Sequence, residues 1–331
     1  MQDVTENAAY LERPAQVLAP GVQLLRGQYS IDRYLGMGGF GITYLATNSL
    51  DRKVVLKECF PGVLSIRDGL TVRPRKTGFE HDYRTIVSMF VREARHLARL
   101  SHPNIVAVHQ VFEENDTAYI ALDLIEGREL LDYANAKDEH CSPQSVVRLL
   151  SRLLTTLDYM HGEGMLHRDI APDNIIVDSQ DNPVLIDFGA AVLREKVSER
   201  TRTSLLAVKD GYSPPENYLK GAEQTVASDL YSLGATMYHL ISGNAPAPSN
   251  ERMAAVAQGQ SDPYVPLSGQ YPGYQEMVLG SIDNALRLDA NKRYQSARAW
   301  SQALPAQISN SSSVLQLLRK RRETTAANAG R

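Results

Sequence analysis

The chain has 331 residues, of which 43% are hydrophobic and 22% charged. This composition is typical of a soluble globular protein, and the length allows two lobes with a sizeable core. A net charge of −3 excludes the strongly basic balance of many nucleic-acid-binding proteins, so we expect no nucleic-acid partner. No apolar run of about 18 residues predicts a transmembrane helix, and the N-terminus lacks the apolar core of a signal peptide.

The cysteines favour a reducing compartment. There are two, Cys59 and Cys141, far apart and without the spacing of a metal site. Because disulfides form mainly in secreted proteins, we expect two free thiols and a cytoplasmic location.

A glycine-rich motif opens the predicted fold. It reads G-x-G-x-x-G from Gly36 to Gly41. Dinucleotide-binding folds carry the same motif, but there a helix follows it. Here a β-branched run follows at 42–47, and a turn leads to a second strand, 52–57, that ends in Lys57. Because glycines let backbone N–H groups approach phosphates, the pattern predicts a phosphate-binding flap between two strands.

A long connection then precedes a helix. Residues 59–85 include a predicted hairpin at 66–72 with an Asp-Gly turn. The connection is locally basic, which suits either a docking surface or a solvated surface feature; the basic residues are Arg67, Arg73, Arg75 and Lys76. Apolar residues at helical spacing predict a helix over 79–100, and Glu93 lies within it.

The second half of the chain reads as mainly helical. Residues 118–127 predict a buried strand that runs into a linker. Ser142 and Pro143 predict the start of a helix that continues to about Met160. A further apolar helix is expected from Ser228 onward.

The most informative stretch is 167–174, which reads H-R-D-x-x-x-x-N, and D-F-G follows at 187–189. With the glycine loop and Lys57, the chain resembles the eukaryotic-like protein kinases, and more closely their bacterial Hanks-type serine/threonine branch, over about residues 26–307. The resemblance implies a two-lobed α+β protein-kinase fold. A β-rich N-lobe (26–122) and a mainly helical C-lobe (126–307) would make up the kinase domain.

The resemblance also implies catalytic roles. Asp169 is the expected base, and Lys57, paired with Glu93, contacts the α- and β-phosphates of ATP. Asn174 and Asp187 are the expected ligands of Mg²⁺, with Mn²⁺ as an alternative.

ATP contacts are implied in the glycine loop, the adenine slot and the hinge. The residues are Gly36, Met37, Gly38, Gly39, Phe40, Gly41, Thr43, Val55, Lys57, Asp123, Ile125 and Ile176. Two of them depart from the family pattern, which usually has Val at position 43 and Ala at position 55. We therefore expect an altered fit to the base rather than loss of binding.

Two structural contacts are implied as well. Asp229 would anchor the backbone of the catalytic loop. Arg293 would pair with Glu216, which ends the stretch Pro214-Pro215-Glu216.

One departure lies in the catalytic loop itself. Ser/Thr members of the family carry a lysine two residues after the catalytic Asp, but this chain has Ala171 there. Lys209 stands where such kinases usually place a threonine that contacts the same Asp. Our hypothesis is that the Lys209 ammonium replaces the missing cation, since its loss would remove a few kcal/mol of transition-state stabilisation. The alternative is a solvated lysine.

The segment between Asp187 and Glu216 carries several hydroxyls. Phosphorylation of Thr201 or Thr203 would let Arg168 pair with the phosphate and order the segment. The alternative is a mobile, hydroxyl-rich loop.

The two ends of the chain lie outside the kinase pattern. Residues 1–25 predict a poorly ordered lead-in that docks in part. Residues 308–331 form a Ser-rich and basic tail. The tail contains the basic run Arg-Lys-Arg-Arg at 319–322. This run could bind an anionic membrane or a partner; the alternative is a solvated tail.

The sequence therefore predicts a protein kinase that transfers the γ-phosphoryl of ATP to Ser or Thr of unidentified proteins. Autophosphorylation and a role in signalling are expected with it. One alternative is a pseudokinase that acts as an ATP-binding scaffold or regulator. Another is a small-molecule kinase, against which a full activation segment ending in Pro-Pro-Glu argues.

Overall fold

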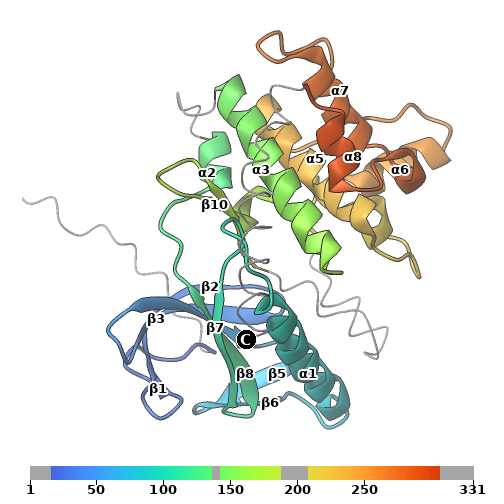
Figure 1. Ribbon diagram of the computed structural model, residues 1–331. Coiled ribbons are helices and arrows are strands. Elements are labelled where there is room, and N and C mark those ends of the chain that lie inside the picture. The colour runs from blue at the N-terminus through green and yellow to red at the C-terminus, as the bar shows by residue number, and fades with distance from the viewer. Residues whose placement is uncertain (1–15, 136–141, 188–207, 306–331) are drawn as a thin grey trace, which may run out of the picture. The chain divides into compact units, whose positions relative to one another are not determined.

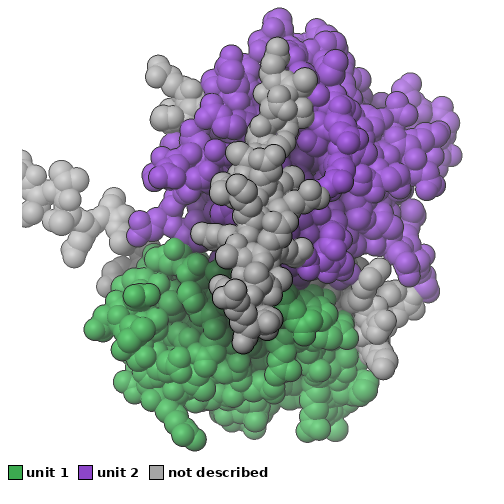
Figure 2. Space-filling view, in the orientation of Figure 1, with its two compact units in different colours: residues 1–99, 107–124, 192–207 green, residues 100–106, 125–191, 208–331 purple. Residues whose placement is uncertain are grey.

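A computed structural model describes residues 16–135, 142–187 and 208–305. The chain divides into two compact units, shown in green and purple in Figure 2. Unit 1 comprises Met1–Arg99, Ala107–Leu124 and Val192–Ala207, and unit 2 comprises Leu100–Val106, Ile125–Ala191 and Val208–Arg331.

Unit 1 is built on an antiparallel six-stranded sheet with the order β1-β2-β3-β4-β8-β7 (Figure 1). Its strands are β1 Gln23–Leu24, β2 Tyr29–Met37, β3 Gly41–Asn48, β4 Lys53–Cys59, β7 Val108–Glu114 and β8 Thr117–Asp123. A separate hairpin, β5 Ser65–Asp68 with β6 Thr71–Pro74, confirms the Asp-Gly turn, since Gly69 adopts a positive φ of 61°.

The two faces of this sheet carry different side chains. Thr43 lies opposite Lys57 on the neighbouring strand, and Leu45 lies opposite Val55, so these four side chains share one face. The other face carries Tyr44, Leu56 and Glu58, each with no exposed surface. Lys57 and Glu58, adjacent in sequence, therefore point to opposite faces of β4.

The β5–β6 hairpin and the chain near its start contact this second group of side chains. The guanidinium of Arg67 forms an ion pair with the Glu58 carboxylate, and their side chains are 4% and 0% exposed. Gln16 accepts hydrogen bonds from Arg67, and the Leu18 amide donates to the Tyr44 hydroxyl. The solvated alternative therefore does not hold for Arg67, because a buried carboxylate supplies its partner.

Helix α1, Glu80–Leu97, confirms the helix expected over 79–100. Its buried side chains recur at helical spacing, and Glu80 and Asp82 place negative charge at the positive end of the helix dipole. The hydroxyl of Tyr83 donates to the backbone carbonyl of Asp116, which ties α1 to the β7–β8 turn.

Unit 2 is mainly helical, with a small three-stranded sheet in the order β11-β10-β9. Its elements are β9 Arg128–Glu129, α2 Leu130–Asn135, α3 Pro143–Gly162, β10 Ile175–Val177, β11 Pro183–Leu185, α5 Val226–Ser242, α6 Ser249–Ala257, α7 Glu276–Ala285 and α8 Ala297–Gln302. Ser142 caps α3 by accepting from the Ser145 amide, as its sequence predicts.

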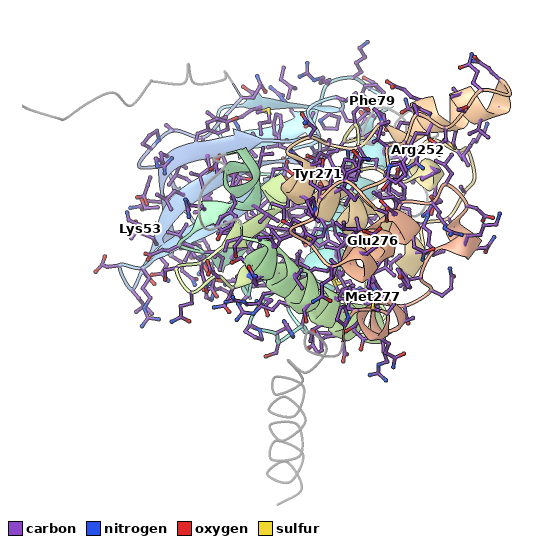
Figure 3. The ribbon with its side chains drawn as sticks, turned by 90° about the horizontal axis from the view of Figure 1, so that it is seen from above. Lys53, Phe79, Arg252, Tyr271, Glu276 and Met277 are labelled. Carbon is purple, nitrogen blue, oxygen red and sulfur yellow. The ribbon has the colours of Figure 1, made fainter. Side chains whose placement is uncertain are left out.

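Two buried arginines hold unit 2 together. Arg293 pairs with Glu216 at 2.8 Å, which confirms the expected structural contact. Arg252, labelled in Figure 3, pairs with Asp262 and donates to the Leu286 carbonyl. Within the ranges described, no helix combines the length and the apolar character that crossing a membrane requires.

Candidate active site

The H-R-D loop of unit 2 is shaped by a buried carboxylate on α5. Asp229 is 1% exposed, and its oxygens accept from the His167 amide at 2.9 Å and the Arg168 amide at 2.8 Å. Burial alone would raise the pKa of Asp229, but the hydrogen bond and the charge of His161 hold it below its ordinary value. The expected anchoring role of Asp229 is confirmed. Arg168 takes a positive φ of 68°, so the loop has the strained backbone that a fixed anchor can hold.

Asp169 is held by the asparagine five residues later. The side-chain amide of Asn174 donates to the Asp169 carbonyl at 2.7 Å and to its carboxylate at 2.8 Å. A single 3₁₀ turn, Pro172–Asn174, sets this return contact. The spacing H-R-D-x-x-x-x-N thus has a local structural reason.

Lys209 lies beside the same loop. Its ammonium is 3.4 Å from the Asp169 carboxylate and 2.9 Å from both carboxylate oxygens of Asp173. Ala171, where the family usually has lysine, is fully buried. The segment around Lys209 is fixed, because its amide donates to the Ser213 hydroxyl and its carbonyl accepts from the Tyr212 and Ser213 amides. The wholly solvated alternative does not describe this side chain, which is 25% exposed.

The electrostatics of Asp169 are balanced between opposing effects. Burial and, to a smaller extent, the nearby carboxylate of Asp187 raise the pKa of Asp169, and the positive charge of Lys209 lowers it; the net pKa is about 6. Lys209 therefore favours the ionised form, which is the form that can accept a proton.

Asn174 and Asp187 present oxygens that suit a hard cation. The Ile186 amide donates to the Asn174 carbonyl at 3.0 Å. This hydrogen bond places the backbone of Asp187, the next residue, near Asn174. The side-chain nitrogen of Asn174 donates to Asp169, so a metal ion would have to bind the side-chain oxygen of Asn174. The described residues hold no cluster of three or more His, Cys, Asp or Glu side chains fit for a metal. A few oxygen donors suit Mg²⁺, because phosphate oxygens and water usually complete its coordination shell.

The glycine loop in unit 1 joins β2 and β3, and the Gly38 amide donates to the Gly41 carbonyl at 2.9 Å. At Gly41 a Cβ would stand 2.3 Å from the Glu58 carbonyl oxygen, whereas at Gly38 it would meet nothing within 4 Å. Gly41 is therefore required by the approach of β4, independently of any phosphate. Phe40 is buried, and its carbonyl accepts from the Phe60 amide at 2.9 Å.

The remaining predicted residues are distributed between the two units. Lys57 is 9% exposed on β4, and Glu93 is half-buried on α1. The Asp123 amide donates to the Ala107 carbonyl, so this amide is already engaged within the protein. The neighbouring exposed strand lysine, Lys53, which is labelled in Figure 3, forms an ion pair with Asp32. Of the other residues expected to contact ATP, Thr43, Val55 and Ile176 are half-buried.

Several expectations fall outside the described residues, and sequence reasoning missed one contact. Phe188 and Gly189 of the D-F-G motif, the candidate phosphorylation sites Thr201 and Thr203, and the basic tail are not described. The missed contact is that of Asp173 with Lys209. Its only signal in the sequence was a carboxylate inside the loop and an unexplained lysine 36 positions later.

Together, the two-unit α+β fold and the loop of Asp169, Asn174 and Asp187 define the protein kinase class. A family model described as protein kinase domain matches residues 29–304. The chain belongs to this family.

Two of the similar proteins are bacterial kinases. Serine/threonine-protein kinase PknJ of Mycobacterium tuberculosis is 32% identical over 85% of this chain and 45% of its own length. Serine/threonine-protein kinase PrkC of Bacillus subtilis is 28% identical over 82% of this chain and 39% of its own. The solved structure "PpkA-294 apo form" has a TM-score of 0.75 and 33% identity, covering 88% of this chain and all of that one. The chain spans less than half the length of these two curated relatives. The expected bacterial Hanks-type family and kinase fold are confirmed.

Proposed function

We propose that the chain transfers the γ-phosphoryl group of ATP to serine or threonine hydroxyls of proteins. The observation that carries this proposal is the arrangement of Asp169, Asn174 and Lys209 around one loop, in a chain whose relatives are named serine/threonine-protein kinases. These names also argue against the pseudokinase alternative. A cytoplasmic location and autophosphorylation at Thr201 or Thr203 belong to the proposal.

In this mechanism the substrate hydroxyl approaches Asp169, whose carboxylate accepts its proton. The Asn174 amide fixes the carboxylate, so the proton acceptor is in place before the substrate arrives. Lys57 and the glycine loop bind the phosphates of ATP, and the Asp123 carbonyl contacts adenine. Asn174 and Asp187 would hold the metal ion, which would supply positive charge to the phosphates. Mg²⁺ is proposed, with Mn²⁺ as the alternative.

Lys209 has a specific place in this proposal. Its ammonium supplies the positive charge that the family usually places at position 171. Two observations support it: the 3.4 Å distance to the Asp169 carboxylate, and the buried Ala171, which leaves no cation of its own. Asp173 holds Lys209 in place from the other side. Positive charge near a transferring phosphoryl group stabilises the transition state electrostatically.

The deciding experiment is incorporation of labelled phosphate from γ-labelled ATP with Mg²⁺, in the full chain and in Asp187→Ala. Incorporation on Ser or Thr in wild type alone, located by phosphosite mapping, is the expected result. No incorporation in a chain that still binds ATP would instead support the pseudokinase. A small-molecule kinase would leave protein acceptors unlabelled, and a screen of low-molecular-weight alcohols would identify it.

A further inference from the structure

The ammonium of Lys209 can act on the reaction only if the turn that carries it is held in place. This turn spans residues 209–213 and is named the Lys209 turn below. The Lys209 carbonyl accepts from the Tyr212 amide at 3.0 Å and from the Ser213 amide at 2.9 Å. The Lys209 amide donates to the Ser213 hydroxyl at 3.0 Å. These bonds close the turn on itself, so its place beside the catalytic loop depends on contacts with the rest of unit 2.

Two of these contacts hold the backbone of the Lys209 turn. The hydroxyl of Ser249, the first residue of α6, is buried and donates to the Ser213 carbonyl at 2.7 Å. Gly211 has a positive φ of 83°, and a Cβ there would stand 2.8 Å from the Ala245 side chain and 3.0 Å from the Pro246 carbonyl oxygen. The chain that follows α5 therefore approaches the turn too closely for a side chain at position 211.

The third contact is made by side chains. The Tyr212 hydroxyl forms a hydrogen bond with Nδ1 of His239, which lies near the end of α5. The two rings are tilted by 32°, with their centroids 6.0 Å apart. His239 is 8% exposed and Tyr212 is half-buried. The contact thus ties the Lys209 turn to a helix that also carries Asp229, the anchor of the catalytic loop.

The protonation states at neutral pH suit this hydrogen bond. Burial, with a smaller effect of the Asp173 charge, raises the pKa of Tyr212 to about 12, so the hydroxyl keeps its proton. Burial lowers the pKa of His239 below its ordinary value of 6.5, so the ring is neutral and has an acceptor nitrogen. The hydroxyl therefore donates to Nδ1. Removing either group would take away the buried partner of the other, so the two should be energetically coupled.

We propose that His239 is a positioning residue, which keeps the Lys209 ammonium beside Asp169 by holding the Tyr212 hydroxyl and, with it, the Lys209 turn. The proposal rests on the proposed kinase function, because it deepens the role given there to Lys209. His239 acts through two other residues, whereas the Lys209 ammonium itself is 3.4 Å from the Asp169 carboxylate. A displacement of about 1 Å at a reacting group can cost roughly 10²-fold in rate, so a hydrogen bond behind that group can influence the reaction.

The test compares chains that differ by one hydroxyl or one acceptor. Tyr212→Phe removes the hydroxyl, His239→Leu removes the acceptor nitrogen, and His239→Asn keeps an acceptor oxygen near the position of Nδ1. The matched control is Tyr238→Phe, because Tyr238 also lies on α5 and its hydroxyl donates to the Val265 carbonyl, outside the Lys209 turn. The rate is that of labelled phosphate incorporation from γ-labelled ATP into the full chain itself, measured over a range of ATP concentrations.

We expect Tyr212→Phe and His239→Leu each to lower the rate at saturating ATP by about fivefold, the usual effect of one lost hydrogen bond. The half-saturating ATP concentration should be nearly unchanged. A chain with both changes should be no slower than either single variant, since both remove the same contact. His239→Asn and the control should stay within about twofold of wild type. Because Tyr212→Phe removes a single oxygen atom, the test does not depend on whether His239→Leu folds.

The decisive comparison uses a chain that already carries Lys209→Ala. There Tyr212→Phe should lower the rate by less than about twofold, because the side chain that the contact positions is gone. A purely structural role would give the same loss with and without Lys209. An equal loss in the two backgrounds, or an unchanged rate in Tyr212→Phe alone, would overturn the proposal.

Hydrogen exchange distinguishes failure of this proposal from failure of the proposed function. The Lys209 carbonyl protects the amides of Tyr212 and Ser213, so loosening the turn should speed their exchange. Mass spectrometry of peptides from this segment measures the exchange in the full chain bearing Asp187→Ala, so that phosphotransfer plays no part. We expect exchange to be about fivefold faster with Tyr212→Phe and unchanged with Tyr238→Phe.

Unchanged exchange with Tyr212→Phe would overturn the positioning role, whatever the activity of the chain. A wild type without phosphotransfer, combined with faster exchange in Tyr212→Phe, would overturn the proposed function and would still establish that the hydroxyl holds the Lys209 turn.

Discussion

Two basic side chains, Lys209 in unit 2 and Arg67 in unit 1, each lie against a carboxylate that belongs to a different element of the same unit. Arg67 is 4% exposed, and its partner Glu58 is completely buried and also accepts from the Tyr44 and Tyr119 hydroxyls. Lys209 is 25% exposed, and its partner Asp169 is 21% exposed. Arg67 and Glu58 form the Glu58 cluster, which is enclosed by the protein. Lys209 and Asp169 form the Asp169 cluster, which is partly exposed and therefore accessible to a substrate.

This difference separates a structural ion pair from a candidate catalytic one. A buried pair whose carboxylate oxygens both accept hydrogen bonds from the protein offers no access to a substrate, so its removal should change stability. A partly exposed pair with a raised carboxylate pKa can exchange partners during a reaction, so its removal should change rate. Variants of the two clusters should therefore give opposite results.

The largest expected effect is that of Asp169→Asn. It removes the proposed proton acceptor but keeps the shape of the side chain, so kcat should fall by up to about 10⁴-fold. The melting temperature should not drop, because a neutral amide avoids the cost of burying a charge. Steady-state kinetics and thermal unfolding on one preparation measure both. A variant that keeps wild-type kcat would remove Asp169 from the catalytic role.

Arg67→Met should show the reverse pattern. It leaves the Glu58 carboxylate buried without its cation, which typically costs about 3–5 kcal/mol of unfolding free energy. Denaturant unfolding measures the loss, and kcat per folded molecule should be nearly unchanged. Arg67→Met combined with Glu58→Gln should recover part of the loss. If the double variant is as unstable as the single one, the ion pair is not the cause.

Lys209→Ala should lower kcat by about 10²–10³-fold, the range for loss of one electrostatic donor to a transition state. The KM for ATP should change far less, because the ammonium lies beside the Asp169 carboxylate and is proposed to act mainly in the transition state. Lys292→Ala, at an exposed pair with Asp289, is the matched control and should leave both constants unchanged. An unchanged kcat in Lys209→Ala would refute the replacement of the missing cation.

Gly41→Ala and Gly38→Ala should separate packing from phosphate binding in the glycine loop. The new methyl group at position 41 would clash with the Glu58 carbonyl, so we expect a destabilisation of about 1–3 kcal/mol. At position 38 the methyl group meets open space, so stability should be retained. Thermal unfolding without nucleotide provides the comparison, and equal melting temperatures would show that β3 and β4 can separate at low cost.

The smallest effect concerns pH. Burial lowers the pKa of His102 from 6.5 to about 4, so between these values the unfolded state binds more protons than the folded state. Stability should therefore decline as pH falls from 6.5 towards 4. His102→Asn keeps an acceptor for the Asn104 amide but cannot titrate, so its stability should depend less on pH. Some dependence should persist, since the pKa of buried His167 is lowered in the same direction. A pH dependence equal to that of wild type would exclude a contribution from His102.

Local sequence determined a large part of this protein. The helical spacing of apolar residues predicted α1, Ser142 and Pro143 predicted the start of α3, and Asp68-Gly69 predicted the β5–β6 turn. The catalytic loop could be predicted because Asp169 and Asn174 meet within a single turn of chain. In each case the interacting residues are only a few positions apart, so their spacing encodes the contact.

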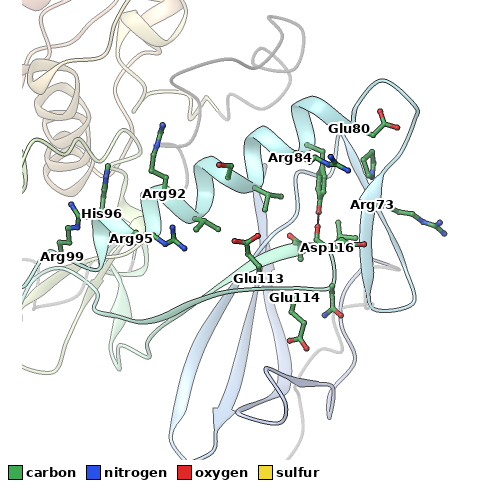
Figure 4. A pocket seen from close by; sticks show the side chains of 18 residues that line it. Arg73, Glu80, Arg84, Arg92, Arg95, His96, Arg99, Glu113, Glu114 and Asp116 are labelled. Atoms are coloured by element: carbon green, nitrogen blue, oxygen red, sulfur yellow. Dashed lines mark hydrogen bonds between the residues drawn. The ribbon is translucent and has the colours of Figure 1, made fainter.

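Only the tertiary structure decided which charges of different elements meet. In the sequence Arg67 is one of several basic residues in a connection, but in the structure it forms an ion pair with Glu58 on β4. Lys209 forms hydrogen bonds with Asp173, which lies 36 positions earlier. The groove along α1 that Figure 4 shows likewise requires β6 and the β7–β8 turn to come together. Spacing carries no information about such pairs, because sheet pairing and burial bring them together. A lysine and an arginine that look alike in the sequence thus acquire different surroundings, one open to substrate and the other enclosed by the fold.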